Sequence, residues 1–70
     1  MKLHYYPETD SLYIDLTGTP GVSTREIVEG FVADFDGSGN LVGLDIDHAS
    51  SKLDLSKVET ISLPSTTAAA

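Results

Sequence analysis

The stretch 34–45 constrains the fold of this chain most strongly, because it fits two quite different structures. Its sequence is Asp-Phe-Asp-Gly-Ser-Gly-Asn-Leu-Val-Gly-Leu-Asp. In one interpretation it is a calcium loop, in which carboxylates surround a cation. In the other it is part of a β-hairpin, in which the same residue types serve the backbone conformation of the turn. The residues that flank the stretch favour one of the two.

The calcium interpretation rests on the ligand spacing of an EF-hand loop. Such a loop carries oxygen ligands at positions 1, 3, 5 and 12 and glycine at position 6. Counted from Asp34, these positions hold Asp34, Asp36, Ser38, Asp45 and Gly39. An aspartate at position 12 has a shorter reach than the usual bidentate glutamate. An EF-hand also needs a helix on each side, whereas both flanks here are β-branched and alternating, so calcium binding is kept as the alternative.

The hairpin interpretation accounts for the flanks as well. Apolar and polar residues alternate with a period of two over 31–36 and 42–47, which is typical of half-buried strands. Residues 37–40 (Gly-Ser-Gly-Asn) tolerate the positive φ angles of hairpin turns. A turn centred on Ser38 and Gly39 predicts apolar pairs on one face: Phe35 with Val42, Ala33 with Leu44, and Phe31 with Ile46.

The opposite face of this hairpin is predicted to be acidic. In the same register Asp34 lies across from Gly43, and Asp36 lies across from Leu41. The carboxylates expected on this face are Asp34, Asp36, Asp45 and Asp47, and they repel one another unless they are solvated or neutralised. Four aromatic and apolar residues are expected among them: Tyr6, Tyr13, Val32 and Leu41. They indicate a contact surface, or alternatively they pack locally as cross-strand pairs.

The remaining patterns predict a mostly β structure. Residues 2–6 and 11–16 alternate on either side of a Pro-Glu-Thr-Asp turn at 7–10, and 24–28 is a third strand candidate. With the hairpin at 31–47 they predict an α+β fold, mostly β. We expect an antiparallel meander of about five strands, built around two hairpins, with a short C-terminal helix packed on one face.

The C-terminal part of the chain changes its periodicity. Residues 48–53 are expected to form one or two helical turns, and Ser56 and Glu59 have capping-box spacing. A short strand at 61–63 is an alternative. We expect four apolar residues to cover the apolar face of the sheet: Leu53, Leu55, Val58 and Ile61.

The length of 70 residues corresponds to one small domain, which we assign to residues 1–63. Residues 64–70 lack an apolar anchor and are expected to be a flexible C-terminal tail. Such a short chain buries only about 60% of its unfolded surface, and it has no cysteine to form a disulfide. Self-association is therefore an expected source of burial. The lack of cysteine is compatible with a cytoplasmic location, and no apolar run has the length of a membrane span.

The charge balance excludes one class of partner. Eleven acidic residues against four basic ones give a net charge of −7. This charge repels phosphate backbones, and the chain has no basic stripe, so nucleic-acid binding is not expected. A basic protein partner remains open.

We assign no catalytic, cofactor or metal residue from the sequence. The only histidines, His4 and His48, lack the spacing of zinc ligands. Paired carboxylates such as Asp34 and Asp45 need a pocket that shifts their pKa values, and a small sheet offers little concavity. Gly37-Ser38-Gly39 opens a strand and not a helix, unlike a phosphate loop. We therefore do not expect an enzyme.

Three segments resemble a small prokaryotic family called domain of unknown function 2283. Residues 5–14 (Tyr-Tyr-Pro-Glu-Thr-Asp-Ser-Leu-Tyr-Ile) are similar to its opening, Tyr-turn-Asp-x-Leu-Tyr-Ile. Residues 34–39 match its Asp-x-Asp-x-x-Gly hairpin, and 42–50 are similar to Val-Gly-Ile-Glu-Ile-x-x-Ala-Ser. Asp45 stands where the family usually has Glu, which weakens any fixed role for that carboxylate. The resemblance covers about residues 3–53.

The resemblance implies a small antiparallel sheet with a short C-terminal helix. It implies no established activity, cofactor or catalytic residue. Some members are encoded beside small toxin-like proteins, which implies an antitoxin-like role. We therefore expect a non-enzymatic protein-interaction or self-associating module, with a homo-oligomer or a small protein as partner. Calcium binding through 34–45 is the alternative.

Overall fold

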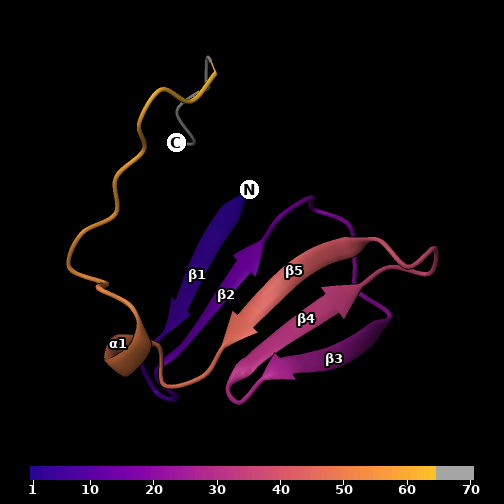
Figure 1. Cartoon of the computed structure of the whole chain (residues 1–70), viewed down its shortest axis with the longest axis horizontal. Coiled ribbons are helices and arrows are strands. Elements are labelled where there is room, and N and C mark those ends of the chain that lie inside the picture. The colour runs from indigo at the N-terminus through magenta and orange to yellow at the C-terminus, as the bar shows by residue number, and fades with distance from the viewer. Residues whose placement is uncertain (65–70) are drawn as a thin grey trace.

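The computed structural model describes residues 1–64, which form one five-stranded sheet and one short helix (Figure 1). The elements are β1 (Lys2–Tyr6), β2 (Ser11–Asp15), β3 (Ser23–Val28), β4 (Phe31–Phe35), β5 (Leu41–Ile46) and α1 (Ala49–Lys52). The predicted antiparallel, mostly β fold with a short C-terminal helix is confirmed. Most of the predicted tail, residues 65–70, lies outside the described residues. No helix within 1–64 is long and apolar enough to cross a membrane.

The strands lie in the order β1-β2-β5-β4-β3. Strands β3, β4 and β5 follow one another as a meander, and the β1–β2 hairpin joins it because β2 pairs with β5. Local alternation predicts the two hairpins, but it does not specify this junction. As a result β5 is the central strand, and β1 and β3 are the two edges of the sheet.

The hairpin between β4 and β5 has the predicted register except beside its turn. Two of the three predicted apolar pairs form, but the third is wrong because Phe35 pairs with Leu41 and not with Val42. The turn is tighter than predicted, because Asp36 lies across from Asn40 and not from Leu41. The Asp36 N–H donates to the carbonyl of Asn40 at 2.9 Å. The Asp36 carboxylate also accepts the Asn40 N–H at 2.9 Å. A β-bulge next to Phe35 then restores the predicted register.

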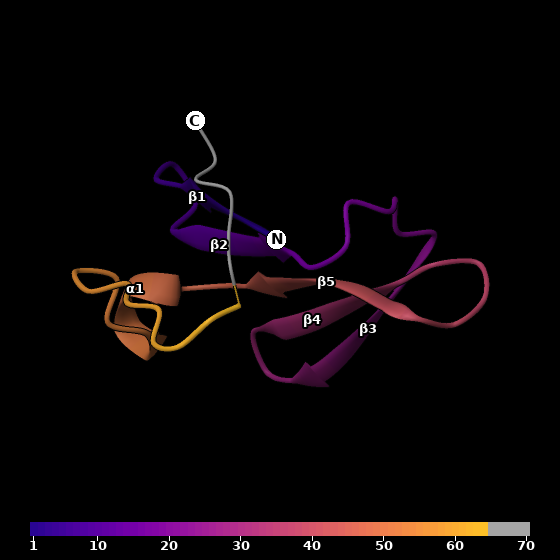
Figure 2. The ribbon, with the colours of Figure 1, turned by 90° about the horizontal axis from the view of Figure 1, so that it is seen from above.

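Ala33 and Val42 are buried within the sheet, and a further cluster of buried residues sits at the end of the apolar face beside α1. Leu12 and Ile46 pack there against Ala49 of α1, which is fully buried. The partly buried residues packed against this cluster are Ile14, Phe31, Leu53 and Leu55. Figure 2 shows the sheet as a single twisted layer with α1 beside one end. The helix therefore covers only part of the face.

The residues after α1 form neither helix nor strand, and we call this segment the C-terminal arm (residues 53–64; Figure 1). Leu53 and Leu55 pack on the core as predicted. The prediction for Val58 and Ile61 is wrong, because they are 71% and 79% exposed. Neither the capping-box helix nor the alternative short strand forms. The Ser56 N–H instead bonds to the carboxylate two residues earlier, a local turn that competes with helix formation.

The chain exposes more surface than a compact monomer of its size. Its accessible area is 5427 Å², whereas a folded monomer of 7.4 kDa is expected to expose about 4,200 Å². Large apolar side chains are exposed on β1 and after α1, among them Leu3, Val58 and Ile61. The fold therefore leaves apolar surface for a further contact.

Candidate functional site

An apolar groove of about 480 Å³ lies between β1 and the C-terminal arm. Its lining residues come from β1, β2, α1 and the arm and are Leu3, Tyr5, Leu12, Ser50, Leu55 and Val58. Leu12 is buried at the core, whereas Leu3 is 49% exposed at the rim. Alternation in β1 places Leu3 and Tyr5 on the same side of the strand. The groove is thus the continuation of the apolar face where neither the helix nor another strand covers it.

Asp10 fixes one end of this groove. It lies in the β1–β2 turn with φ 54°, a conformation that aspartate tolerates better than most residues. Its carboxylate accepts hydrogen bonds from the Tyr5 hydroxyl at 2.7 Å and the Ser50 hydroxyl at 2.7 Å. It also accepts the Ser50 N–H at 3.1 Å, and its carbonyl accepts the Ala49 N–H at 2.8 Å. Asp10 thereby joins the first hairpin to the start of α1.

The Asp10 contacts have a clear electrostatic consequence. The bonds from Ser50 and Tyr5 lower the pKa of Asp10, because they stabilise its charged form. The same bond to Asp10 raises the pKa of Tyr5. His48 occupies the N-cap position of α1 but makes no side-chain cap. The carboxylate from the turn therefore supplies the acceptor that the helix start lacks, and it holds two walls of the groove in place.

On the face of the sheet opposite the groove, the side chain of Tyr13 lies across the central strand β5. Its hydroxyl donates to Asp34 on β4 at 2.9 Å, and its ring covers Gly43 on β5, where an added Cβ would collide with it. The bond to Asp34 and burial raise the pKa of Tyr13 to about 12. Of the two interpretations given for Tyr13, these contacts support local packing within the sheet, and a role in a contact surface stays a prediction. Leu41 does not lie among the acidic residues as predicted, because it pairs with Phe35.

The acidic face forms around Tyr13, and β2 adds a member to it. Asp15 pairs with Gly43 and so lies beside Asp34, because β2 is the neighbour of β5. Asp45 is partly buried, and its Oδ1 has no hydrogen-bond partner among residues 1–64. Burial, and then the charges of Asp47 and Asp34, raise the pKa of Asp45. Like charges therefore gather on this face, and Lys2 of β1 pairs with Asp15 at its edge.

The residues of the calcium alternative take up hairpin roles. The Asp36 carboxylate accepts the backbone N–H and side-chain amide of Asn40 and then the N–H of Ser38, and these bonds lower its pKa. Asp34 is bonded to the tyrosine that crosses the sheet, and Asp45 pairs with a residue of β4. Within the described part of the chain, no group of three or more His, Cys, Asp and Glu could hold a metal ion.

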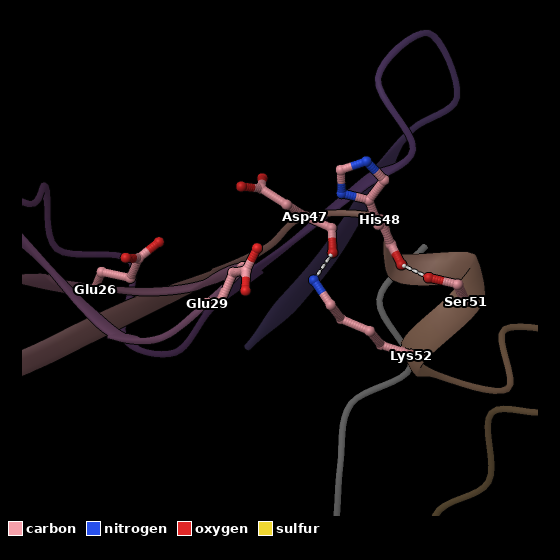
Figure 3. Close-up of a pocket in the computed structure, with 7 residues that line it drawn as sticks. Glu26, Glu29, Asp47, His48, Ser51 and Lys52 are labelled. Carbon is pink, nitrogen blue, oxygen red and sulfur yellow. Dashed lines mark hydrogen bonds between the residues drawn. The ribbon is translucent and has the colours of Figure 1, made fainter.

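A second, polar hollow of about 420 Å³ lies beside α1 (Figure 3). Its lining residues are Glu26, Glu29, Gly30, Asp47, His48, Ser51 and Lys52. The Lys52 amino group donates to the carbonyl of Asp47 at 2.5 Å and lies 5.3 Å from the centre of the Phe31 ring. Lys52 therefore anchors the end of α1 to the sheet. Figure 3 shows the Glu26 carboxylate apart from the other side chains, so these groups do not converge on one point.

Comparison with known proteins places these features in a family. A model described as a protein of unknown function (DUF2283) matches residues 2–50. No curated protein and no solved structure gives a significant match. The matched range contains all five strands and one wall of the groove, whereas Leu55 and Val58 of the other wall lie beyond it. The chain belongs to the DUF2283 family.

Proposed function

We propose that this acidic protein is a non-enzymatic, cytoplasmic module that self-associates through its groove. The observation that carries the proposal is the uncovered apolar surface on β1 and the C-terminal arm. Leu3, Val58 and Ile61 are all about half or more exposed there. Exposed apolar surface that is gathered in one place marks contact sites in soluble proteins.

The distribution of charge supports the same face. The groove lining contains no aspartate, glutamate, lysine or arginine, whereas Asp15, Asp34 and Asp45 lie on the opposite face. Interface cores are depleted in charged residues because a charge that loses its water without a partner is costly. A contact at the groove avoids that cost. For a second, different protein, the net charge of −7 favours a small basic partner, as an antitoxin-like role requires.

Sedimentation equilibrium over a wide concentration range tests this proposal. Val58 and Val22 form a matched pair, since both are valines with 71% exposure and only Val58 lines the groove. The parent protein is expected to exceed its monomer mass of 7.4 kDa as concentration rises. Val58→Asp should remove this increase, and Val22→Asp should keep it.

Two results would contradict the proposal. One is a single 7.4 kDa species at every concentration. The other is an equal effect of Val58→Asp and Val22→Asp on the measured mass, because a general effect of added charge would then explain the data. Circular dichroism of both variants checks that they remain folded.

A further inference from the structure

We infer that the groove of one copy receives the C-terminal arm of a second copy, in a two-fold dimer that exchanges its arms. This inference rests on the proposed self-association and adds the element that fills the groove. Within one chain the groove and its occupant are both exposed: Val58 forms the outer wall, and Ile61 and Leu63 follow it uncovered, at 79% and 53% exposure.

The course of the arm explains why its own groove is not filled. Leu55 and Val58 line the groove from the arm side, and the chain then continues away from α1 without regular secondary structure (Figure 1). Ile61 and Leu63 are not among the lining residues of their own groove. A second copy related by a two-fold axis can offer the same residues from outside. Because such an interface uses one patch twice, both grooves are filled in a single step.

Electrostatics favours the arm over other surfaces of the second copy. The chain carries a net charge of −7, but residues 55–63 (Leu-Ser-Lys-Val-Glu-Thr-Ile-Ser-Leu) contain one lysine and one glutamate and are neutral overall. The groove lining is also free of charged residues. An uncharged groove and an arm with no net charge come together at this contact, while the acidic faces of the two copies lie away from it. Two strongly acidic chains can therefore approach there with little repulsion.

The side chains that would form the contact are uncovered in a single copy. Ile61 and Leu63 of the arm are 79% and 53% exposed, and Leu3 at the groove rim is 49% exposed. A contact between them removes this apolar surface from water. The arm lies beyond the range 2–50 that the family model matches, so arm exchange is inferred for this chain.

Cysteine pairing between two variants tests the exchange directly, because the chain contains no cysteine. Leu3→Cys places a thiol at the groove rim, and Ile61→Cys places one on the arm. Both sites are about half or more exposed, so neither change removes a buried side chain. The two variants are refolded together and oxidised mildly, and mixed disulfide dimers are counted by mass spectrometry. Val22→Cys, mixed with Leu3→Cys, is the matched control.

Three outcomes are distinguishable. Arm exchange predicts several-fold more mixed dimers for Leu3→Cys with Ile61→Cys than for the control mixture. If the parent is a dimer by sedimentation but the two mixtures crosslink equally, arm exchange is overturned and self-association stands. If the parent is a monomer by sedimentation and neither mixture crosslinks above background, both proposals are overturned.

Discussion

Replacing Gly43 with alanine is expected to destabilise the protein, although the same change in an ordinary strand interior is favourable. Glycine within a strand usually costs about 0.5–1 kcal/mol relative to alanine, because it loses more backbone entropy on folding. At Gly43, however, a Cβ would collide with the Tyr13 hydroxyl and ring. The ring must then move away from β5, and its hydroxyl loses the 2.9 Å bond to Asp34.

The size of the effect follows from these opposing contributions. A hydrogen bond to a charged group contributes about 1.5–3 kcal/mol, and the lower end applies here because the pair is only partly buried. The displaced ring loses a further ~1 kcal/mol of packing, while the backbone gain returns about 0.5–1 kcal/mol. The net destabilisation is about 1–2 kcal/mol. For a domain of this size, this corresponds to a fall in melting temperature of about 5–15 °C.

Urea unfolding at one fixed protein concentration measures this change, since self-association makes stability concentration-dependent. Gly37→Ala is the matched control: its Cβ would meet nothing within 4 Å, and Gly37 does not have a positive φ. It should be neutral or stabilising by about 0.4–1 kcal/mol. In a Tyr13→Val background, Gly43→Ala should likewise cease to destabilise. An unchanged stability of Gly43→Ala, or an equal loss in both backgrounds, would refute the reasoning.

Three further changes test other parts of the structure. Asp10→Asn should lower the melting temperature at pH 7 and flatten its acid dependence. The pKa of Asp10 is held below its usual 3.8, so its contribution is present above about pH 4 and is lost as pH falls through the folded value; an unchanged pH profile in thermal melts would count against this role. Asp45→Asn should raise the melting temperature at pH 7, because burial raises the pKa of Asp45 and penalises its charged form. This advantage should vanish below pH 3.8, where Asp45 is protonated in the unfolded chain as well. A lower melting temperature of the variant at pH 7 would contradict this prediction. Millimolar calcium should leave the melting temperature unchanged, because Asp36 and Asp34 already accept hydrogen bonds, whereas a rise that Asp34→Asn abolishes would establish the calcium alternative.

The predictable parts of this fold are those that local patterns determine. Alternation over 31–36 and 42–47 predicts the pairing of Phe31 with Ile46, because one face of each strand must be apolar. The pairing of Phe35 is not predictable in this way. It depends on whether Asp36 closes the turn through Asn40, which is a matter of individual hydrogen bonds.

The groove was not predictable, because its walls are far apart in the sequence. Tyr5 and Asp10 lie in one motif that resembles the family, and Ser50 lies in another. Their contact depends on the pairing of β2 with β5, which no local pattern specifies. The exposure of Val58 and Ile61 also escaped prediction, since apolar residues normally indicate burial. The contact between the two family-like segments, 5–14 and 42–50, is the feature that indicates the groove end of the sheet.

A concentration series of two-dimensional amide NMR spectra tests the central claim, contact through the groove, most directly. The account predicts that the signals of Leu3, Tyr5, Ser50 and Val58, which line the groove, shift as the protein is diluted. The signals of Asp34 and Gly43 on the opposite face should stay constant. Spectra that do not change with concentration, or changes confined to the acidic face, would contradict the account.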